Sequence, residues 1–222
     1  MIYQTELCNL QNPIYANFFT NLISTCTKSS EWTLSSGAPS NVFFDIDAYM
    51  SDPRKIIELT DLISLKIEEL IIAGNDFDKI AFIEKVDGTV GLITLFSSII
   101  NKINKPSIII RPKKKLIKNA IKGSISKGER ILIINDVATS GKTIFDAAEI
   151  VWAHGGKTPY AFVVLDRLQG GTENLDRKGI KLFSLTSTNS INVNIGDKIG
   201  KTIKITEPVL KDFGGQVITL AS

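Results

Sequence analysis

The loop of residues 135–143 has the composition of an anion-binding site. It follows the apolar run 131–134 and begins with Asn135 and Asp136, after which come small, hydroxyl-bearing and basic residues: Ala138, Thr139, Ser140, Gly141, Lys142 and Thr143. Open α/β sheets bind ligands at such a place, where a strand ends and a helix starts. Free N–H groups and the dipole of the helix favour a phosphate there. We therefore predict that residues 138–143, the phosphate loop, bind a phosphate group.

Asp136 and Gly141 suit this site for different reasons. A carboxylate can accept hydrogen bonds from ribose hydroxyls, and glycine lets the backbone approach a ligand closely. The phosphate loop of nucleoside triphosphatases is excluded, because it needs a longer glycine-flanked spacing before its lysine, whereas only Gly141 precedes Lys142 here. The alternative is a simple helix cap, since Asp, Ser and Thr commonly start helices. The length of the run favours the phosphate site.

A cluster of cations follows the apolar run 107–110. It contains Arg111, Lys113, Lys114, Lys115 and Lys118. Charge runs are usually solvated faces, and a charged segment between buried strands has few apolar contacts, so we expect residues 111–129 to be mobile without ligand. The cluster lacks the interleaved aromatic residues of a nucleic-acid binder, and the chain has no helix-turn-helix region. Nucleic acid is therefore not an expected partner.

The elements that must position these residues alternate between strands and helices. Short apolar, β-rich runs predict buried strands at 79–83, 107–110, 130–134, 160–165 and 180–185. Longer helical spacing predicts helices at 53–74, 89–103 and 142–154, with a shorter one at 172–178. This alternation predicts a mainly parallel sheet with helices on both faces and the strand before Asn135 near its middle. The predicted fold class is α/β.

The two ends of the chain differ from this core. We predict one domain over residues 1–222, with a hood (1–50), a core (51–187) and a C-terminal extension (188–222). In the hood we expect a helix at 13–23 and short strands at 31–34 and 43–45 around a turn at 35–39. Alternating apolar residues after Ser190 predict a C-terminal β-ribbon.

Composition sets the class of protein. The 222 residues are 43% hydrophobic and 22% charged, which suits one globular domain, and the net charge of +3 is too small to indicate a nucleic-acid protein. Cys8 and Cys26 are too few for a disulfide scaffold and lack metal-ligand spacing. No run approaches the roughly 20 apolar residues of a membrane span. We expect a soluble, cytoplasmic protein.

Three separated segments resemble the type I phosphoribosyltransferases. Residues 131–143 are similar to the family's phosphoribosyl diphosphate signature, in which an apolar strand and two acidic residues precede Thr-Ser/Thr-Gly-x-Thr. Residues 165–175, Leu-Asp-Arg-Leu-Gln-Gly-Gly-Thr-Glu-Asn-Leu, resemble the orotate-specific branch, and residues 32–45 resemble its N-terminal hairpin. The resemblance implies a type I phosphoribosyltransferase fold with a Rossmann-like core, closest to the orotate phosphoribosyltransferases.

The resemblance also implies roles for individual residues. The phosphate loop would bind the 5′-phosphate of phosphoribosyl diphosphate, and Asn135 and Asp136 the ribose hydroxyls. Arg167 would bind the carboxylate or ring edge of orotate or another pyrimidine-like base, for which its planar fork is suited; the alternative is a surface ion-pair residue. Substrate diphosphate would be bound by cations of two further loops: Lys85, Arg111, Lys113, Lys114 and Lys115.

The implied reaction transfers the 5-phosphoribosyl group to orotate through an oxocarbenium-like state. Arg111 and Lys115 would stabilise the leaving diphosphate, from a loop that the neighbouring subunit of a homodimer supplies in the family. Mg²⁺ is the implied cofactor; it would be held through diphosphate and ribose oxygens, with Asp136 as the candidate protein ligand. No covalent nucleophile is required.

Several positions depart from the family's pattern. Asn135 replaces the first acidic residue of the signature, and Pro112 and Ile117 replace a lysine and a histidine of the cationic loop. Asp87 stands near a base-contacting lysine of some members, and Ser35 replaces a hairpin lysine of others. Loss of a general acid can reduce the rate by about 10²-fold or more. The alternative function is therefore a weak or inactive paralogue that binds phosphoribosyl diphosphate or a nucleotide as a regulatory sensor.

Overall fold

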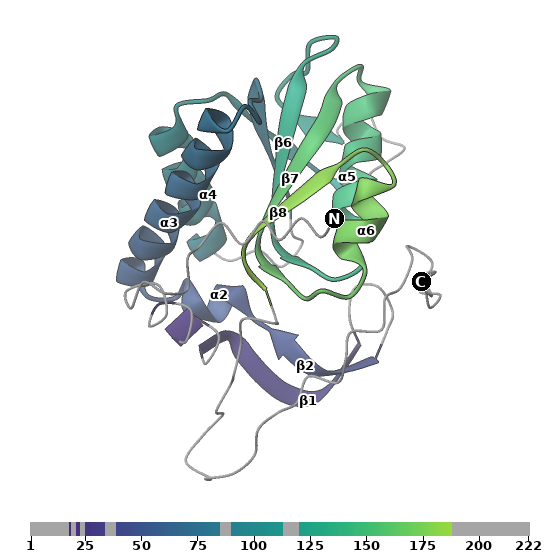
Figure 1. Cartoon of the computed structure of the whole chain (residues 1–222). Helices are drawn as coiled ribbons and strands as arrows, with labels where there is room; N and C mark the ends of the chain where they lie inside the picture. The colour runs from purple at the N-terminus through teal and green to yellow at the C-terminus, as the bar shows by residue number, and fades with distance from the viewer. Residues whose placement is uncertain are drawn as a thin grey trace.

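The computed structural model describes residues 18, 21–22, 25–33, 39–84, 90–112 and 120–187. Six strands form its main sheet: β3 (Lys79–Ile83), β4 (Ser107–Ile110), β5 (Ile121–Lys122), β6 (Arg130–Ala138), β7 (Lys157–Asp166) and β8 (Lys181–Ser187). Their order is β5-β4-β3-β6-β7-β8, and all neighbours are parallel except β4 and β5. The predicted α/β fold with a mainly parallel sheet is confirmed, and β6 lies near the middle (Figure 1).

Helices cover both faces of this sheet. Helices α3 (Pro53–Ile72) and α4 (Val90–Ile103) lie on one face, and α5 (Lys142–Ala153) and α6 (Gly171–Asp176) on the other (Figure 1). The alternation along β6 explains the two layers: Leu132 and Ile134 belong to the core under α3 and α4, whereas Ile131 and Ile133 belong to the core under α5. Because both faces are buried, the strands read as continuous apolar runs.

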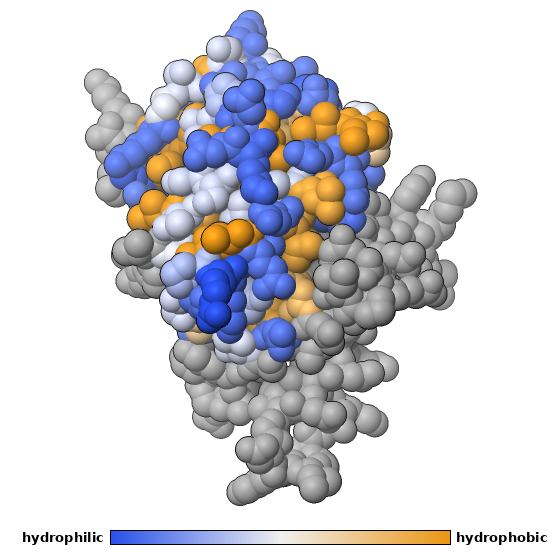
Figure 2. All heavy atoms as spheres, turned by 90° about the vertical axis from the view of Figure 1, so that its left-hand side faces the viewer, coloured by the Kyte–Doolittle hydropathy of each residue, from blue (hydrophilic) through white to orange (hydrophobic). Residues whose placement is uncertain are grey.

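The surface of the α3–α4 layer retains some apolar residues. Ile57 and Ile72 of α3 are 63% and 86% exposed, and Ile93 of α4 is 64% exposed. Figure 2 views this side and shows apolar patches between hydrophilic residues. Among the described residues, no helix is long and apolar enough to cross a membrane.

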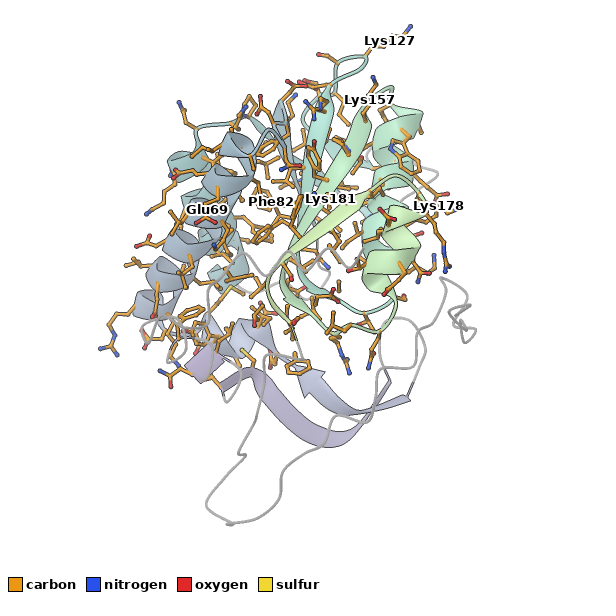
Figure 3. The ribbon with its side chains drawn as sticks, viewed as in Figure 1. Glu69, Phe82, Lys127, Lys157, Lys178 and Lys181 are labelled. Atoms are coloured by element: carbon orange, nitrogen blue, oxygen red, sulfur yellow. The ribbon has the colours of Figure 1, made fainter. Side chains whose placement is uncertain are left out.

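A small antiparallel ribbon lies at one end of the main sheet. Strand β1 (Thr27–Thr33) pairs with β2 (Pro39–Phe44), and the short helix α2 (Ile46–Tyr49) follows. Lys127 and Lys157, near the amino ends of β6 and β7, lie at the opposite end of the sheet (Figure 3). The ribbon therefore lies toward the carboxyl ends of the parallel strands, where α/β sheets bind ligands (Figure 1).

The structure differs from the predicted elements in a few boundaries. Strand β6 continues to Ala138, so Asn135 and Asp136 lie inside the strand instead of after it. Strand β2 begins at Pro39, which we predicted in the turn; proline is tolerated as the first residue of a strand. The short elements β5 and α2 have too few residues to show a period, and no pattern predicted them.

Other predictions for the ends of the chain are tested little or not at all. Residues 18, 21 and 22 of the predicted helix 13–23 are helical. The predicted C-terminal β-ribbon lies outside the described residues, and the division into hood, core and extension stays a prediction.

Candidate functional site

The phosphate loop surrounds a hollow at the start of α5. The hollow has a volume of about 210 Å³ and is lined by residues 137–144, together with Asn135, Pro112 and Asp146. The first helical hydrogen bond runs from the Phe145 N–H to the carbonyl of Gly141 at 2.9 Å. The N–H groups of residues 142–144 precede that bond and have no partner within the helix. Together with the helix dipole, they make the hollow suitable for an anion.

Gly141 shapes this loop through its backbone and its neighbours. It is the N-cap residue of α5, with a φ of +79°, and no side chain caps the helix. The N-cap residue is therefore not one of the Asp, Ser or Thr residues that the capping alternative expects. A Cβ on Gly141 would lie 2.9 Å from Cγ of Leu175 and 3.1 Å from the carbonyl oxygen of Gly171. Besides the close ligand approach that we predicted, glycine is required by the left-handed backbone and by packing against residues 171–175.

Lys142 contributes to the hollow differently from the hydroxyl residues. Its Nζ lies 2.9 Å from Oδ1 of Asp146, one helical turn later. Its half-exposed side chain thus forms an ion pair within α5, while its backbone N–H lies at the start of the helix. Ser140 is 7% exposed, and Thr139 and Thr143 line the hollow with it. These three hydroxyls can donate to a phosphate as predicted.

Asn135 and Asp136 are separated by the alternation of β6. Asn135 lines the hollow, and its Nδ2 donates to the carbonyl of Val137 at 3.2 Å. Asp136 follows Leu132 and Ile134 on the other side of the strand and is not part of the lining. Both side chains are buried. The two predicted ribose ligands therefore leave β6 in opposite directions.

Arg167 lies next to the phosphate loop, immediately after β7. Its backbone N–H donates to the carbonyl of Ala138 at 3.0 Å, and its guanidinium carbon lies 5.5 Å from the ring centroid of Phe44 in β2. The residue is only 5% exposed, so the surface ion-pair alternative is wrong. Burial lowers the pKa of the Arg167 guanidinium from its ordinary value, but arginine remains protonated in proteins. The backbone of Arg167 thus contacts the phosphate loop, and its buried guanidinium lies against Phe44.

The segment around Arg167 has a fixed shape. Oδ1 of Asp166 accepts from the Leu168 N–H at 2.8 Å, and Oδ2 accepts from the Thr172 hydroxyl at 2.9 Å. Burial raises the pKa of Asp166, while these two hydrogen bonds act in the opposite direction. Leu168 has a φ of +53°. The hydrogen bonds from Leu168 and Thr172 to Asp166 therefore hold the turn that contains Arg167. We call residues 166–175 the base segment.

Asn174 connects the base segment to the phosphate loop. Its Nδ2 donates to the carbonyl of Ser140 at 3.0 Å, and both residues are buried. Asn174, Asp166 and Thr172 belong to the 165–175 motif, but no role was predicted for them. The motif was the available signal, since it has these polar residues within a few positions of Arg167.

Arg111 is placed at the same edge of the sheet, after β4. Its Nη2 donates to Oε1 of Glu84 at 2.9 Å, while its Nε lies 2.7 Å from Oε2 without hydrogen-bond alignment. The backbone N–H of Arg111 donates to the carbonyl of Ala120 at 2.8 Å. The neighbouring Pro112 lines the phosphate hollow. Arg111 is thus anchored to Glu84, a partner that sequence patterns did not identify.

The rest of the cationic region is only partly described. Lys85, Lys113, Lys114 and Lys115, and the departures at Ser35, Asp87 and Ile117, lie outside the described residues. Our reason for expecting residues 111–129 to be mobile is wrong for 120–129. There β5 pairs with β4, and Lys79 lies 3.0 Å from Glu129 Oε1 and donates to the carbonyl of Ser124 at 2.7 Å.

Comparison with known proteins decides the family. No family model matches the sequence. The orotate phosphoribosyltransferase of Pyrococcus horikoshii is 34% identical over 162 residues, which cover 72% of this chain and 83% of that protein. The chain belongs to the orotate phosphoribosyltransferase family. The orotate phosphoribosyltransferase of Methanocaldococcus jannaschii is 30% identical over 170 residues, or 75% of this chain and 89% of that protein.

Solved structures of orotate phosphoribosyltransferases share the fold. The Aeropyrum pernix orotate phosphoribosyltransferase has a TM-score of 0.61 at 24% identity, over 78% of this chain and 95% of that chain. The Mycobacterium tuberculosis orotate phosphoribosyltransferase in complex with 5-phospho-α-D-ribosyl 1-diphosphate has a TM-score of 0.58 at 19% identity. The match covers 82% of this chain and 100% of that chain. Leishmania donovani UMP synthase has a TM-score of 0.65, and the match covers 37% of its chain. The expected type I phosphoribosyltransferase fold is confirmed.

Proposed function

We propose that this chain transfers the 5-phosphoribosyl group from phosphoribosyl diphosphate to orotate, giving orotidine 5′-monophosphate and diphosphate in pyrimidine nucleotide biosynthesis. One observation supports this proposal most: the hollow that suits a phosphate lies next to the segment whose arginine suits the base. The anion hollow at the start of α5 lies beside the segment that carries the buried Arg167, because the backbone N–H of Arg167 donates to the carbonyl of Ala138, which lines the hollow. The relatives named above bear the name of this activity.

The hollow suits the 5′-phosphate. Its donors are the N–H groups at the start of α5 and the hydroxyls of Thr139, Ser140 and Thr143. Hydrogen bonds to a charged acceptor contribute about 1.5–3 kcal/mol each, more than neutral ones. Because the Lys142 side chain is paired with Asp146, recognition of the phosphate would depend mainly on these N–H and hydroxyl groups, whose dipoles have fixed directions. Such donors select a tetrahedral phosphate by geometry and need no free cation.

Arg167 suits the base. Orotate carries a carboxylate, and guanidinium binds carboxylates through two parallel hydrogen bonds. Phe44 lies against the guanidinium, so the ion pair would form away from water, where electrostatic attraction is stronger. The tight turn of the base segment limits the directions in which Arg167 can point. This favours one orientation of the pyrimidine, with its ring nitrogen toward the ribose.

The leaving diphosphate is the proposed ligand of the cationic residues. Arg111 is anchored to Glu84, so diphosphate oxygens would have to replace or share that carboxylate. We assign Lys85, Lys113, Lys114 and Lys115 to the same group, with Lys115 and Arg111 stabilising the departing charge. The transfer breaks the bond between the anomeric carbon and diphosphate and forms one to the ring nitrogen of orotate. No protein nucleophile takes part.

Mg²⁺ fits this site as a companion of the substrate. The described residues contain no group of three or more His, Cys, Asp or Glu that could form a metal cage. Mg²⁺ commonly binds through one or two carboxylates and substrate phosphates, and Asp136 supplies one carboxylate. Asp136 would hold the ion together with the substrate, and the ion would supply positive charge that stabilises the leaving group.

We also propose that the protein is a homodimer. Support comes from the resemblance, in which the neighbouring subunit supplies the cationic loop, and from the exposed apolar residues of the α3–α4 layer. Light scattering should give about twice the chain mass of 24.4 kDa. The mass of a single chain at all concentrations would contradict the dimer.

The activity can be tested by mixing protein, orotate, phosphoribosyl diphosphate and Mg²⁺ and following the loss of orotate absorbance. Turnover supports the proposal. Thermal stabilisation by phosphoribosyl diphosphate without turnover would support the sensor instead. Arg167→Leu should abolish turnover, whereas Arg177→Leu, an exposed arginine at the end of α6, is the matched control and should not. Equal activity of the two variants would overturn the role of Arg167.

A further inference from the structure

We propose that Asn174 is a positioning residue that sets the direction of N–H groups in the phosphate loop, an inference that rests on the function proposed above. The Asn174 side chain donates to the Ser140 carbonyl at 3.0 Å. Asn174 is 3% exposed, so the amide and the carbonyl meet away from water. A buried carbonyl that loses its donor is destabilised, because water does not replace the bond. The hydrogen bond therefore restrains the Ser140 peptide.

The base segment contacts the phosphate loop along its length. Four consecutive loop residues are involved, in the pairs Ala138–Arg167, Thr139–Gly171, Ser140–Asn174 and Gly141–Leu175. The approach is close: a Cβ on Gly171 would lie 2.8 Å from the carbonyl oxygen of Thr139. Leu175 is fully buried. The base segment thus forms a floor against the loop, and none of its residues lines the hollow.

Contacts between the floor and the loop carbonyls also fix the directions of the loop N–H groups. A trans peptide is planar, so the carbonyl of one residue and the N–H of the next point in opposite directions. The Ser140 carbonyl points to Asn174 and the Ala138 carbonyl accepts from Arg167, so the N–H groups of Gly141 and Thr139 point away from the floor. Both residues line the hollow. Asn174 thereby aims the Gly141 N–H at the 5′-phosphate without touching it.

The inference predicts a selective loss of phosphate affinity. Asn174→Leu keeps the number and branching of the side-chain heavy atoms but removes the donor, leaving the Ser140 peptide free to turn. We expect affinity for ribose 5-phosphate to fall about tenfold or more, because the oriented donor is lost. In steady state, the KM for phosphoribosyl diphosphate should rise while the KM for orotate stays within about twofold, since the Asp166 turn still holds Arg167.

Asn75→Leu is the matched control. Asn75 also donates its side-chain Nδ2 to a backbone carbonyl, that of Leu70 at 3.3 Å, after the end of α3. Titration calorimetry with inorganic phosphate and ribose 5-phosphate should show weaker binding by Asn174→Leu and unchanged binding by Asn75→Leu. Binding by Asn174→Leu as tight as wild type would overturn the positioning role alone. If wild type binds neither compound, the phosphate site of the proposed function fails with it.

A second measurement needs no variant and applies even if Asn174→Leu does not fold. In ¹⁵N-labelled wild-type protein, the Gly141 amide resonance should shift when inorganic phosphate is added, as expected for an N–H that donates to the ion. The Gly179 amide, which donates to the Asp176 carbonyl at 2.8 Å beyond α6, should not shift. A Gly141 resonance that stays in place while phosphate binds would overturn the inference.

Discussion

Replacing Gly141 with alanine separates backbone strain from packing at the phosphate loop. The φ of +79° costs a residue with a Cβ about 1–2 kcal/mol. The new Cβ would also lie 2.9 Å from Cγ of Leu175 and 3.1 Å from the Gly171 carbonyl, and overpacking of this kind typically costs about 1–3 kcal/mol. We therefore expect Gly141→Ala to lower the free energy of unfolding by about 2–5 kcal/mol, a large share of the roughly 5–15 kcal/mol typical of a domain.

Gly128 provides the control for this prediction. Its φ is +80°, and a Cβ there would meet nothing within 4 Å, so Gly128→Ala should show the strain alone, about 1–2 kcal/mol. Urea unfolding of both variants measures the difference, and titration with ribose 5-phosphate should show weaker binding only in Gly141→Ala. Equal destabilisation of the two variants would refute the packing of the base segment against Gly141.

Three further variants test other parts of the site. Thr143→Ala removes one hydroxyl donor and should weaken ribose 5-phosphate binding about tenfold or more by calorimetry; unchanged affinity would contradict the phosphate site. Asp136→Asn should weaken phosphoribosyl diphosphate but leave inorganic phosphate binding unchanged, because Asp136 does not line the hollow; weaker inorganic phosphate binding would count against this. Burial raises the pKa of Asp166 in the folded protein above its ordinary value of 3.8. Between these two pKa values the native protein binds more protons than the unfolded chain, so the free energy of unfolding falls as the pH rises. In urea unfolding, Asp166→Asn should lose less stability than wild type as the pH rises above 3.8, and an equal loss would refute the shift.

The order of strands and helices was predictable because burial on both faces leaves a clear pattern. Strands β3 and β4 match the predicted runs 79–83 and 107–110, since each is an uninterrupted apolar run after its first residue. Strand β7 begins at Lys157, three residues before the predicted start, because lysine, threonine and proline hide the strand pattern there. Thr158 is 4% exposed, a burial that only the packed fold reveals.

The site was predictable only where its residues are neighbours in sequence. The phosphate loop is continuous from Ala138 to Thr143, so its composition indicated an anion site before the structure did. The contacts that hold it are distant: Asn174 is 34 positions from Ser140, and Arg111 is 27 positions from Glu84. Such pairs arise from the order in which parallel strands are placed in the sheet, and a single sequence contains no local signal for them.

A crystal structure with orotidine 5′-monophosphate would locate both ends of the nucleotide in one measurement. We expect the phosphate in the hollow, within hydrogen-bond distance of the N–H groups and hydroxyls of residues 139–143, and the pyrimidine carboxylate on Arg167. The ribose should then lie near the end of β6. A nucleotide bound elsewhere, or a pyrimidine that makes no contact with Arg167, would contradict this expectation.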